Sequence, residues 1–361
     1  MDWELLLTRA YPAGRRSSIF YSRGEHDDLR LGDLVRTWDR HSEIQGLLEA
    51  RPQVIILGAP DDLGITMGHG RPGARHGPES IRQAFYRLTP GFVDDLAGGI
   101  VDIGDLRLPE GASDQERLHA THLRMEELVH YLALTGATIV VLGGGQDLTY
   151  GSVMGYTKAQ RHLRQRARQR DGITPEAVDW FGLINVDKFL DVRDPEISGF
   201  NSGTAFFRIL EEADGPVDPA NFVAFAIQEQ HCSPRHRAYL LTKGATLVNL
   251  EQFWLGRENV LNAFDGALGR VQNGTVASMV SFDMNATTLP GVSAPSPLGL
   301  QPGTCCAMAS MAGERGVGLV EFMETSPPHD DRQQPTSRLA ANMLFYFLQG
   351  LSQSLRPTNP A

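Results

Sequence analysis

Eight short apolar runs recur along the chain, separated by segments with helical spacing or by loops rich in glycine and proline. Continuous runs of this kind are typical of strands that are covered on both faces. Strands that alternate with helices form parallel sheets. The pattern therefore predicts a three-layer α/β fold with a mainly parallel, roughly eight-stranded sheet and helices on both faces. The predicted strands lie at 54–60, 100–104, 138–142, 181–186, 222–228, 245–250, 278–283 and 318–323.

Helices are expected between these strands. Pro78 begins one of them, because proline is favoured in a first helical turn, and Ile81 and Phe85 follow at helical spacing. Each such helix would cover one face of the sheet with its apolar side. Further helices are predicted at 113–135, 152–170, 232–243, 257–272 and 336–350.

No linker divides the chain, so one domain is expected over 51–352, with a partly helical N-terminal extension (1–50) and a C-terminal tail (353–361). The net charge of −10 argues against nucleic acid and anionic membranes as partners, and no apolar run approaches the roughly 20 residues that span a bilayer. The N-terminus lacks a signal-peptide pattern, and three cysteines without disulfide or zinc spacing suit a cytoplasmic protein. The basic end of the 152–170 segment is interpreted as a solvated helix face, carrying Arg161, Arg164, Arg166, Arg168 and Arg170.

Acidic or polar residues follow three of the predicted strands. Asp187 and Asp191 come after the 181–186 run, Asp283 closes the 278–283 run, and Gln146 follows the third strand in a Gly143-Gly-Gly-Gln-Asp147 motif. A single aspartate after a strand is usually a helix cap. Three strand ends of this kind favour a shared site, because open α/β sheets bind ligands at their carboxyl edge. The carboxylates are hard oxygen donors of the kind that bind Mg, Mn or Ca.

The residues after Val186 alternate in character. If the chain stays extended here, Asp187, Phe189 and Asp191 point to one side, and Lys188 points to the other. Lys188 would then not neutralise the aspartates. We therefore expect at least one of the converging aspartates to have a raised pKa.

A glycine-rich segment, Gly68-His-Gly-Arg-Pro-Gly73, fits the spacing of a dinucleotide-binding fingerprint. That fingerprint follows its strand directly, whereas this segment lies about eight residues beyond the strand and contains a proline. We interpret it as a surface loop that shapes the mouth of a site.

Taken in order, the motifs between about residues 54 and 350 resemble the ureohydrolase superfamily of arginases, agmatinases and formimidoylglutamases. Ser202, where many relatives carry histidine, and the Ala294-Pro-Ser-Pro run look most like the formimidoylglutamase branch. The resemblance implies an arginase-like fold. It rests on Gly58-Ala-Pro-Asp61, the run from Gly70 to Arg82, Asp102-Ile-Gly-Asp105, the strand-end motifs, Asn201 to Arg208, Leu289 to Leu300 and Glu324-Thr-Ser-Pro327.

Members of this superfamily hold two manganese ions with two histidines and four aspartates, and the ions activate a hydroxide that attacks a guanidine or formimino carbon. By position, Asp187, Asp191 and Asp283 match aspartate ligands. Glu324 matches the glutamate that contacts the amidine group of the substrate. The resemblance thus implies that Asp191 and Glu324 are the catalytic residues.

Three of the six ligand positions are changed. Gln146 stands in place of a histidine of the first ion, and Phe189 and Asn285 stand in place of a histidine and an aspartate of the second. Phenylalanine cannot bind a metal and is expected to fill the cavity. Amide oxygens are weaker ligands for a Mn(II) pair. We therefore expect no cofactor or a single weakly bound divalent cation, rather than binuclear manganese.

The function is left between three alternatives. The first is a catalytically degenerate homologue with a binding or regulatory role. The second is an active hydrolase of C–N bonds in linear amidines that uses one or an altered metal, and the third is an unrelated ligand-binding α/β protein. In the first two, the expected partners are a small guanidino or formimino compound and further copies of the chain. The implied substrate-binding residues are Arg193, Asn201, Ser202 and Glu324.

Overall fold

The computed structural model describes residues 6–8, 19–38, 44–171, 179–212 and 215–355. Within this part, one sheet of ten strands has the order β1-β4-β3-β5-β10-β9-β6-β7-β8, and β2 pairs with β4. The eight predicted strands are confirmed, and all pairings among these eight are parallel. They are β3 (Val54–Ala59), β4 (Ile100–Leu106), β5 (Thr138–Gly143), β6 (Gly182–Val186), β7 (Phe222–Ile227), β8 (Thr246–Asn249), β9 (Ser278–Asp283) and β10 (Leu319–Met323).

Two strands of two residues each come from the N-terminal extension. β1 (Leu7–Thr8) pairs antiparallel with β4, and β2 (Arg36–Thr37) pairs parallel with it. Strands this short leave no periodic pattern in the sequence, and we did not predict them. The described part of the extension also contains the short helices α3 (Leu31–Leu34) and α4 (Ile44–Ala50).

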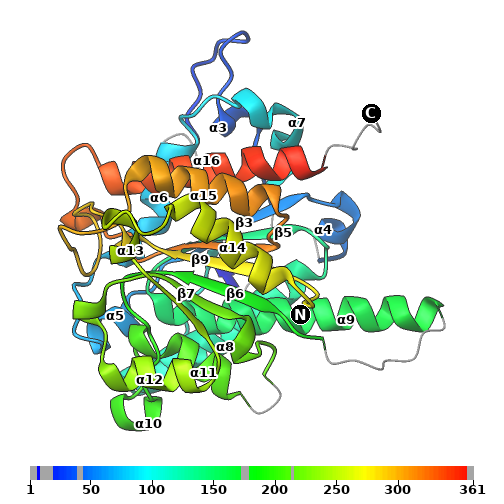
Figure 1. The fold of residues 1–361 in the computed structure, drawn as a ribbon. Coiled ribbons are helices and arrows are strands. Elements are labelled where there is room, and N and C mark those ends of the chain that lie inside the picture. The colour runs from blue at the N-terminus through cyan, green and yellow to red at the C-terminus, as the bar shows by residue number, and fades with distance from the viewer. Residues whose placement is uncertain (1–5, 9–18, 39–43, 172–178, 213–214, 356–361) are drawn as a thin grey trace.

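Helices cover both faces of the sheet, which confirms the three-layer prediction (Figure 1). Alternate residues of each strand enter two separate cores: Ile56 and Val140 enter one, and Ile55 and Val141 enter the other. No helix among the described residues is long and apolar enough to cross a membrane. The first core is covered by α6 (Gly77–Phe85), α14 (Val260–Gln272), α15 (Pro302–Glu314) and α16 (Pro335–Leu355), and the second by α8 (Asp114–Ala133), α9 (Thr149–Asp171), α11 (Ala205–Glu211) and α12 (Pro234–Thr242).

The helix α15 was not predicted, because its small residues give little contrast between an apolar and a polar face. Small residues matter here for packing. A Cβ added at Gly313 of α15 would lie 2.1 Å from the carbonyl oxygen of Phe347, and one at Gly350 of α16 would lie 2.1 Å from that of Ser310. The two glycines therefore let the backbones of α15 and α16 come into contact.

A buried ion-pair group joins α6 to β4. The guanidinium of Arg82 donates to both carboxylate oxygens of Asp102, at 2.8 and 3.0 Å, and to the carboxylate of Asp105. The hydroxyl of Tyr86 also donates to Asp102. Arg82 and Asp102 are 1% and 0% exposed, so this pair lies inside the protein, whereas the side chain of Asp105 is 23% exposed.

Candidate metal and amidine site

Four neighbouring parallel strands, β5, β10, β9 and β6, end at the same edge of the sheet. Asp187 directly follows β6, Asp283 ends β9, and Glu324 directly follows β10. Carboxylate oxygens of Asp187, Asp191 and Asp283 lie within 4.8 Å of one another. The structure thus brings together the three aspartates that the sequence places at strand ends.

Backbone N–H groups orient the carboxylates of Asp187, Asp283 and Glu324. The N–H of Lys188 donates to Asp187 Oδ1 at 2.6 Å, and that of Asn285 donates to Asp283 Oδ1 at 2.6 Å. The N–H of Gln146 donates to Glu324 Oε1 at 2.7 Å. Asp187 Oδ2 is left without a hydrogen-bond partner within the described structure, so it is available to a ligand.

The chain does not stay extended after Asp187. Asp191 has φ of 48°, in the left-handed region, so the residues before it form a bend. Within this bend the ammonium nitrogen of Lys188 lies 4.8 Å from the ring centre of Phe189. The expectation that alternation sends Lys188 and Phe189 to opposite sides is therefore wrong. Lys188 is only 1% exposed, and its ammonium donates to the carbonyl of Ala294.

Burial is the main cause that raises the pKa values of these acids, and the repulsion between them that the sequence led us to expect adds to it. Burial raises the pKa of Asp187 to about 7, and the charge of Glu324 adds to this effect. Burial, followed by the charge of Asp187, raises the pKa values of Asp191 and Asp283 well above that of an ordinary aspartate. Burial also raises the pKa of Glu324 to about 8. A bound cation would oppose all of these shifts.

Gln146 lies in a layer beneath the carboxylates. Its Nε2 donates to Ser281 Oγ at 3.0 Å and to Asn185 Oδ1 at 3.4 Å, and these residues precede Asp283 and Asp187 by two positions on their strands. Gln146 Oε1 and Asp187 Oδ2 are buried and have no hydrogen-bond partner within the described structure. Both atoms are acceptors, so they suit a metal ion or a donor on a ligand.

The positions of the second ion in the superfamily look different. Phe189 is half-buried, and its ring lies edge-on to His231 with 5.8 Å between ring centres. Asn285 Oδ1 accepts the N–H of Ala294 at 2.8 Å, and its Nδ2 donates to Ser293 Oγ at 3.1 Å. The side chain of Asn285 is therefore occupied by the loop that follows it. The clustered aspartates can hold a divalent cation, whereas Phe189 offers no ligand atom and Asn285 Oδ1 is already hydrogen-bonded.

The predicted substrate-binding residues fall into two groups. Asn201 is 1% exposed, and its amide bonds to its own turn, accepting the N–H of Gly203 at 3.0 Å and donating to the carbonyl of Gly199 at 3.0 Å. Ser202 is half-buried beside Gly68 of the glycine-rich loop, and Arg193 is exposed, with a charge that lowers the pKa of Asp191. Arg193 and Ser202 thus remain accessible for contacts with a ligand.

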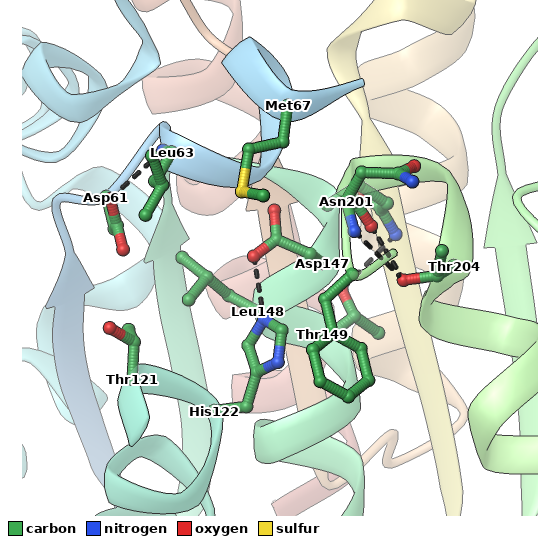
Figure 2. A network of polar contacts seen from close by, with 12 residues as sticks. Asp61, Leu63, Met67, Thr121, His122, Asp147, Leu148, Thr149, Asn201 and Thr204 are labelled. Atoms are coloured by element: carbon green, nitrogen blue, oxygen red, sulfur yellow. Dashed lines mark hydrogen bonds and ion pairs between the residues drawn. The ribbon is translucent and has the colours of Figure 1, made fainter. Parts of the chain in front are cut away.

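A second polar network, which the sequence did not reveal, supports the loop that carries Gln146 (Figure 2). His122 of α8 is fully buried, with Nε2 2.8 Å from Asp147 Oδ2 and Nδ1 2.8 Å from Arg208 Nη1. A guanidinium only donates, so Nδ1 accepts and the Nε2–H donates to Asp147. The ring is then neutral, consistent with burial lowering the pKa of His122. Burial and the charge of Asp147 raise the pKa of nearby Asp61 to about 6.

The fold and the site together define a class: an α/β protein that gathers aspartates at the carboxyl edge of a parallel sheet, where they suit a divalent cation. A family model described as the arginase family matches residues 52–349. The chain belongs to this family.

Similar proteins carry one name repeatedly. Formimidoylglutamase of Streptococcus gordonii is 26% identical over 345 residues, which cover 92% of this chain and 96% of that protein. The crystal structure of Trypanosoma cruzi formiminoglutamase with Mn2+ superposes with a TM-score of 0.71 at 27% identity, covering 92% of this chain and 100% of that one. Formimidoylglutamase from Bacillus subtilis, at 22% identity, has the same fold, with a TM-score of 0.73 and coverage of 93% and 95%.

Proposed function

We propose that this protein is a catalytically degenerate homologue of formimidoylglutamase that binds a small guanidino or formimino compound beside at most one divalent cation. One observation carries the proposal: at the two changed positions of the family's second ion, Phe189 has no ligand atom and the amide of Asn285 is already hydrogen-bonded to the loop that follows it. Asn285 Oδ1 already accepts the N–H of Ala294 at 2.8 Å. A hydroxide bridging two metal ions needs the charge of both of them.

In this proposal each remaining residue has a role in binding. Asp187, Asp191, Asp283 and Gln146 Oε1 would hold the single cation, which would supply a Lewis acid and an activated water when bound. Glu324 would accept N–H groups of an amidine, because planar amidinium donors match the two oxygens of a carboxylate. Arg193 and Ser202 would contact the far end of the ligand. The resemblance to the family also leads us to propose a homo-oligomer.

The alternative is an active hydrolase of linear amidines. The observation that favours it is the name formimidoylglutamase on relatives such as that of Streptococcus gordonii, of which this chain spans 96%. The three aspartates are also in place, within 4.8 Å of one another. Under this alternative, one cation together with Asp191 and Glu324 would carry the reaction.

Restoring the family's ligands tests the proposal directly. The triple change Gln146→His, Phe189→His and Asn285→Asp rebuilds all six ligands, and we expect the manganese content to rise from at most one to about two per chain. Phe189→His alone should change little, because it still faces a neutral amide, and Asn285→Asp alone still faces a phenyl ring. Elemental analysis after dialysis in MnCl2 is the measurement, and Gln228→His, outside the ligand set, is the matched control.

Activity is assayed in the same preparations. Release of urea, ammonia and formamide from guanidino and formimino compounds, with Mn(II) added, separates the two functions. Turnover by the unmodified protein would establish the hydrolase. Two tightly held manganese ions in the unmodified protein would contradict the degenerate site.

A further inference from the structure

Three side chains of the altered metal motifs meet around one residue of a loop. The ammonium of Lys188 donates to the carbonyl of Ala294, and Asn285 Oδ1 accepts the N–H of the same residue at 2.8 Å. The Lys188 ammonium also lies 4.8 Å from the ring centre of Phe189. Phe189 and Asn285 replace ligands of the family's second ion, so the departures from the family pattern form one connected structure.

The rest of this loop is held from the glycine-rich loop. Arg71 Nη2 donates to the carbonyls of Val292 at 2.7 Å and Pro290 at 3.1 Å. The backbone N–H of Arg71 donates to the carbonyl of Ser293 at 3.2 Å. Arg71 therefore holds the segment 290–293, and Lys188 and Asn285 hold its end at Ala294.

Lys188 is also a buried cation that directly follows one of the acids, Asp187, in the sequence. Lys188 is 1% exposed and donates to the carbonyl of Ala294. The preceding residue, Ser293, accepts a hydrogen bond from Asn285 Nδ2 at 3.1 Å. The Lys188 ammonium forms no ion pair with a described carboxylate and instead contacts the Ala294 carbonyl and the Phe189 ring, so its charge acts on the acids over a longer distance. The charges of Asp187 and Asp283 act on Lys188, raising its pKa against the stronger lowering by burial.

We propose that Lys188 is a resident cation that stands in for the second metal ion and fastens the 290–294 loop. The site would then contain one exchangeable divalent cation and one fixed ammonium. The inference rests on the proposed single-cation site, and it adds that the ammonium of Lys188 takes the place of the second metal ion. It predicts that Lys188 weakens metal binding at Asp187, Asp191 and Asp283, because like charges repel.

Lys188→Met keeps an unbranched side chain that is one atom shorter, and it removes the charge and the donor. We expect Mn(II) to bind about tenfold more tightly, a change that corresponds to about 1.4 kcal/mol. We also expect faster amide exchange at Ser293 and Ala294, because the Ala294 carbonyl loses its donor. Titration calorimetry with MnCl2 and hydrogen exchange of the metal-free protein measure the two effects.

Two further variants separate the effect of the Lys188 charge on Mn(II) binding from the effect of the hydrogen bonds that hold the 290–294 loop. Lys188→Arg keeps the charge and should bind Mn(II) as the parent does. Asn285→Leu removes the acceptor for the Ala294 N–H without changing charge, so loop exchange should rise while Mn(II) affinity stays within about twofold. Lys158→Met is the control, since that lysine is 62% exposed and pairs with Glu126 on the surface.

The outcomes distinguish this inference from the proposed function. Unchanged Mn(II) affinity in Lys188→Met, with a thermal transition showing that the variant is folded, would overturn the resident cation. Unchanged exchange at Ala294 in both Lys188→Met and Asn285→Leu would overturn the fastening. A stoichiometry of two manganese ions in the parent protein would instead contradict the proposed function.

Discussion

Two groups of buried carboxylates lie in this protein, and they are compensated in different ways. Asp102 is bonded to the guanidinium of Arg82 through both oxygens, at 2.8 and 3.0 Å. Asp187 and Asp283 form no ion pair with an arginine in the part of the chain that the structure describes. The first group is complete within the fold, whereas the second leaves negative charge for a ligand to balance.

The difference separates acids that hold the fold from acids that bind a ligand. A buried guanidinium that donates to two carboxylates and to the carbonyl of Gly104 joins α6 to β4 within the fold. Acids that crowd together and carry raised pKa values lower the stability of the free protein and are typical of functional sites. Asp187, with its pKa raised to about 7, belongs to the second kind.

The largest expected effect on stability comes from breaking the ion pair between Arg82 and Asp102. Arg82→Met leaves Asp102 buried without its guanidinium, and Tyr86 and the backbone N–H of Gly104 are then among its remaining donors. We expect the free energy of unfolding to fall by about 3–5 kcal/mol, the usual cost of removing one partner of a buried pair. Urea unfolding followed by circular dichroism measures this loss.

Arg170→Met is the matched control for this change. Arg170 is 78% exposed and pairs with Asp171 at the surface, so its removal should change the free energy of unfolding by less than about 0.5 kcal/mol. A loss as small as this in Arg82→Met would show that the buried pair does not hold α6 on β4.

The sequence revealed the strands and the acids at their ends, for a physical reason. Strands buried on both faces must be apolar throughout, and the ends of parallel strands share one edge, so Asp187 and Asp283 were placed together correctly. The direction of Lys188 was not predictable in this way. It depends on a bend that ends at Asp191, which has a left-handed φ of 48°. Such a φ is usual for glycine, so an aspartate at this position gave no sign of the bend in the sequence.

The supporting network was hidden for a different reason. His122 lies on a helix far from Asp147 in sequence, and only the packing of α8 against the Gln146 loop brings them within 2.8 Å. A single histidine among apolar residues carries no sign of its partner. Contacts between distant elements are set by tertiary packing, which periodicity does not contain.

The next largest effect is a pH dependence of protein stability, which we expect from the acids at the sheet edge and not from the group around Asp102. Burial raises the pKa of Asp187 to about 7 and of Glu324 to about 8, so the folded protein retains protons that the unfolded chain releases at lower pH. Stability from a raised acid pKa is lost as pH rises through the folded value. One retained proton between pH 7 and 8.5 corresponds to about 2 kcal/mol.

We therefore expect the metal-free protein to be less stable at pH 8.5 than at pH 7, by urea unfolding in EDTA. Buried His122 has a lowered pKa and acts in the opposite direction, but its contribution is gained mainly below about pH 7 and does not mask the loss. Saturating Mn(II) should remove the loss. An equal decline with and without the cation would show that it arises outside Asp187, Asp191 and Asp283.

The smallest expected effect gives the clearest test. The same substitution, Asp→Asn, should change the free energy of unfolding in opposite directions in the two groups of carboxylates. Asp283→Asn removes a charge that burial and the neighbouring Asp187 already disfavour. At pH 8.5 without metal, this should raise the free energy of unfolding by about 1 kcal/mol and flatten the pH profile. Asp102→Asn should lower it, because the guanidinium of Arg82 loses the carboxylate to which Nε and Nη2 donate.

Asp283→Asn should also weaken Mn(II) binding, since an amide oxygen replaces a carboxylate. A higher free energy of unfolding together with weaker Mn(II) binding would show that the acid serves ligand binding and not the stability of the fold. If Asp283→Asn destabilised the metal-free protein as Asp102→Asn does, the aspartates at the sheet edge would be structural. The backbone N–H of Asn285, which donates to Asp283 Oδ1 at 2.6 Å, can also donate to the new amide oxygen, so the turn itself is not the cause of either result.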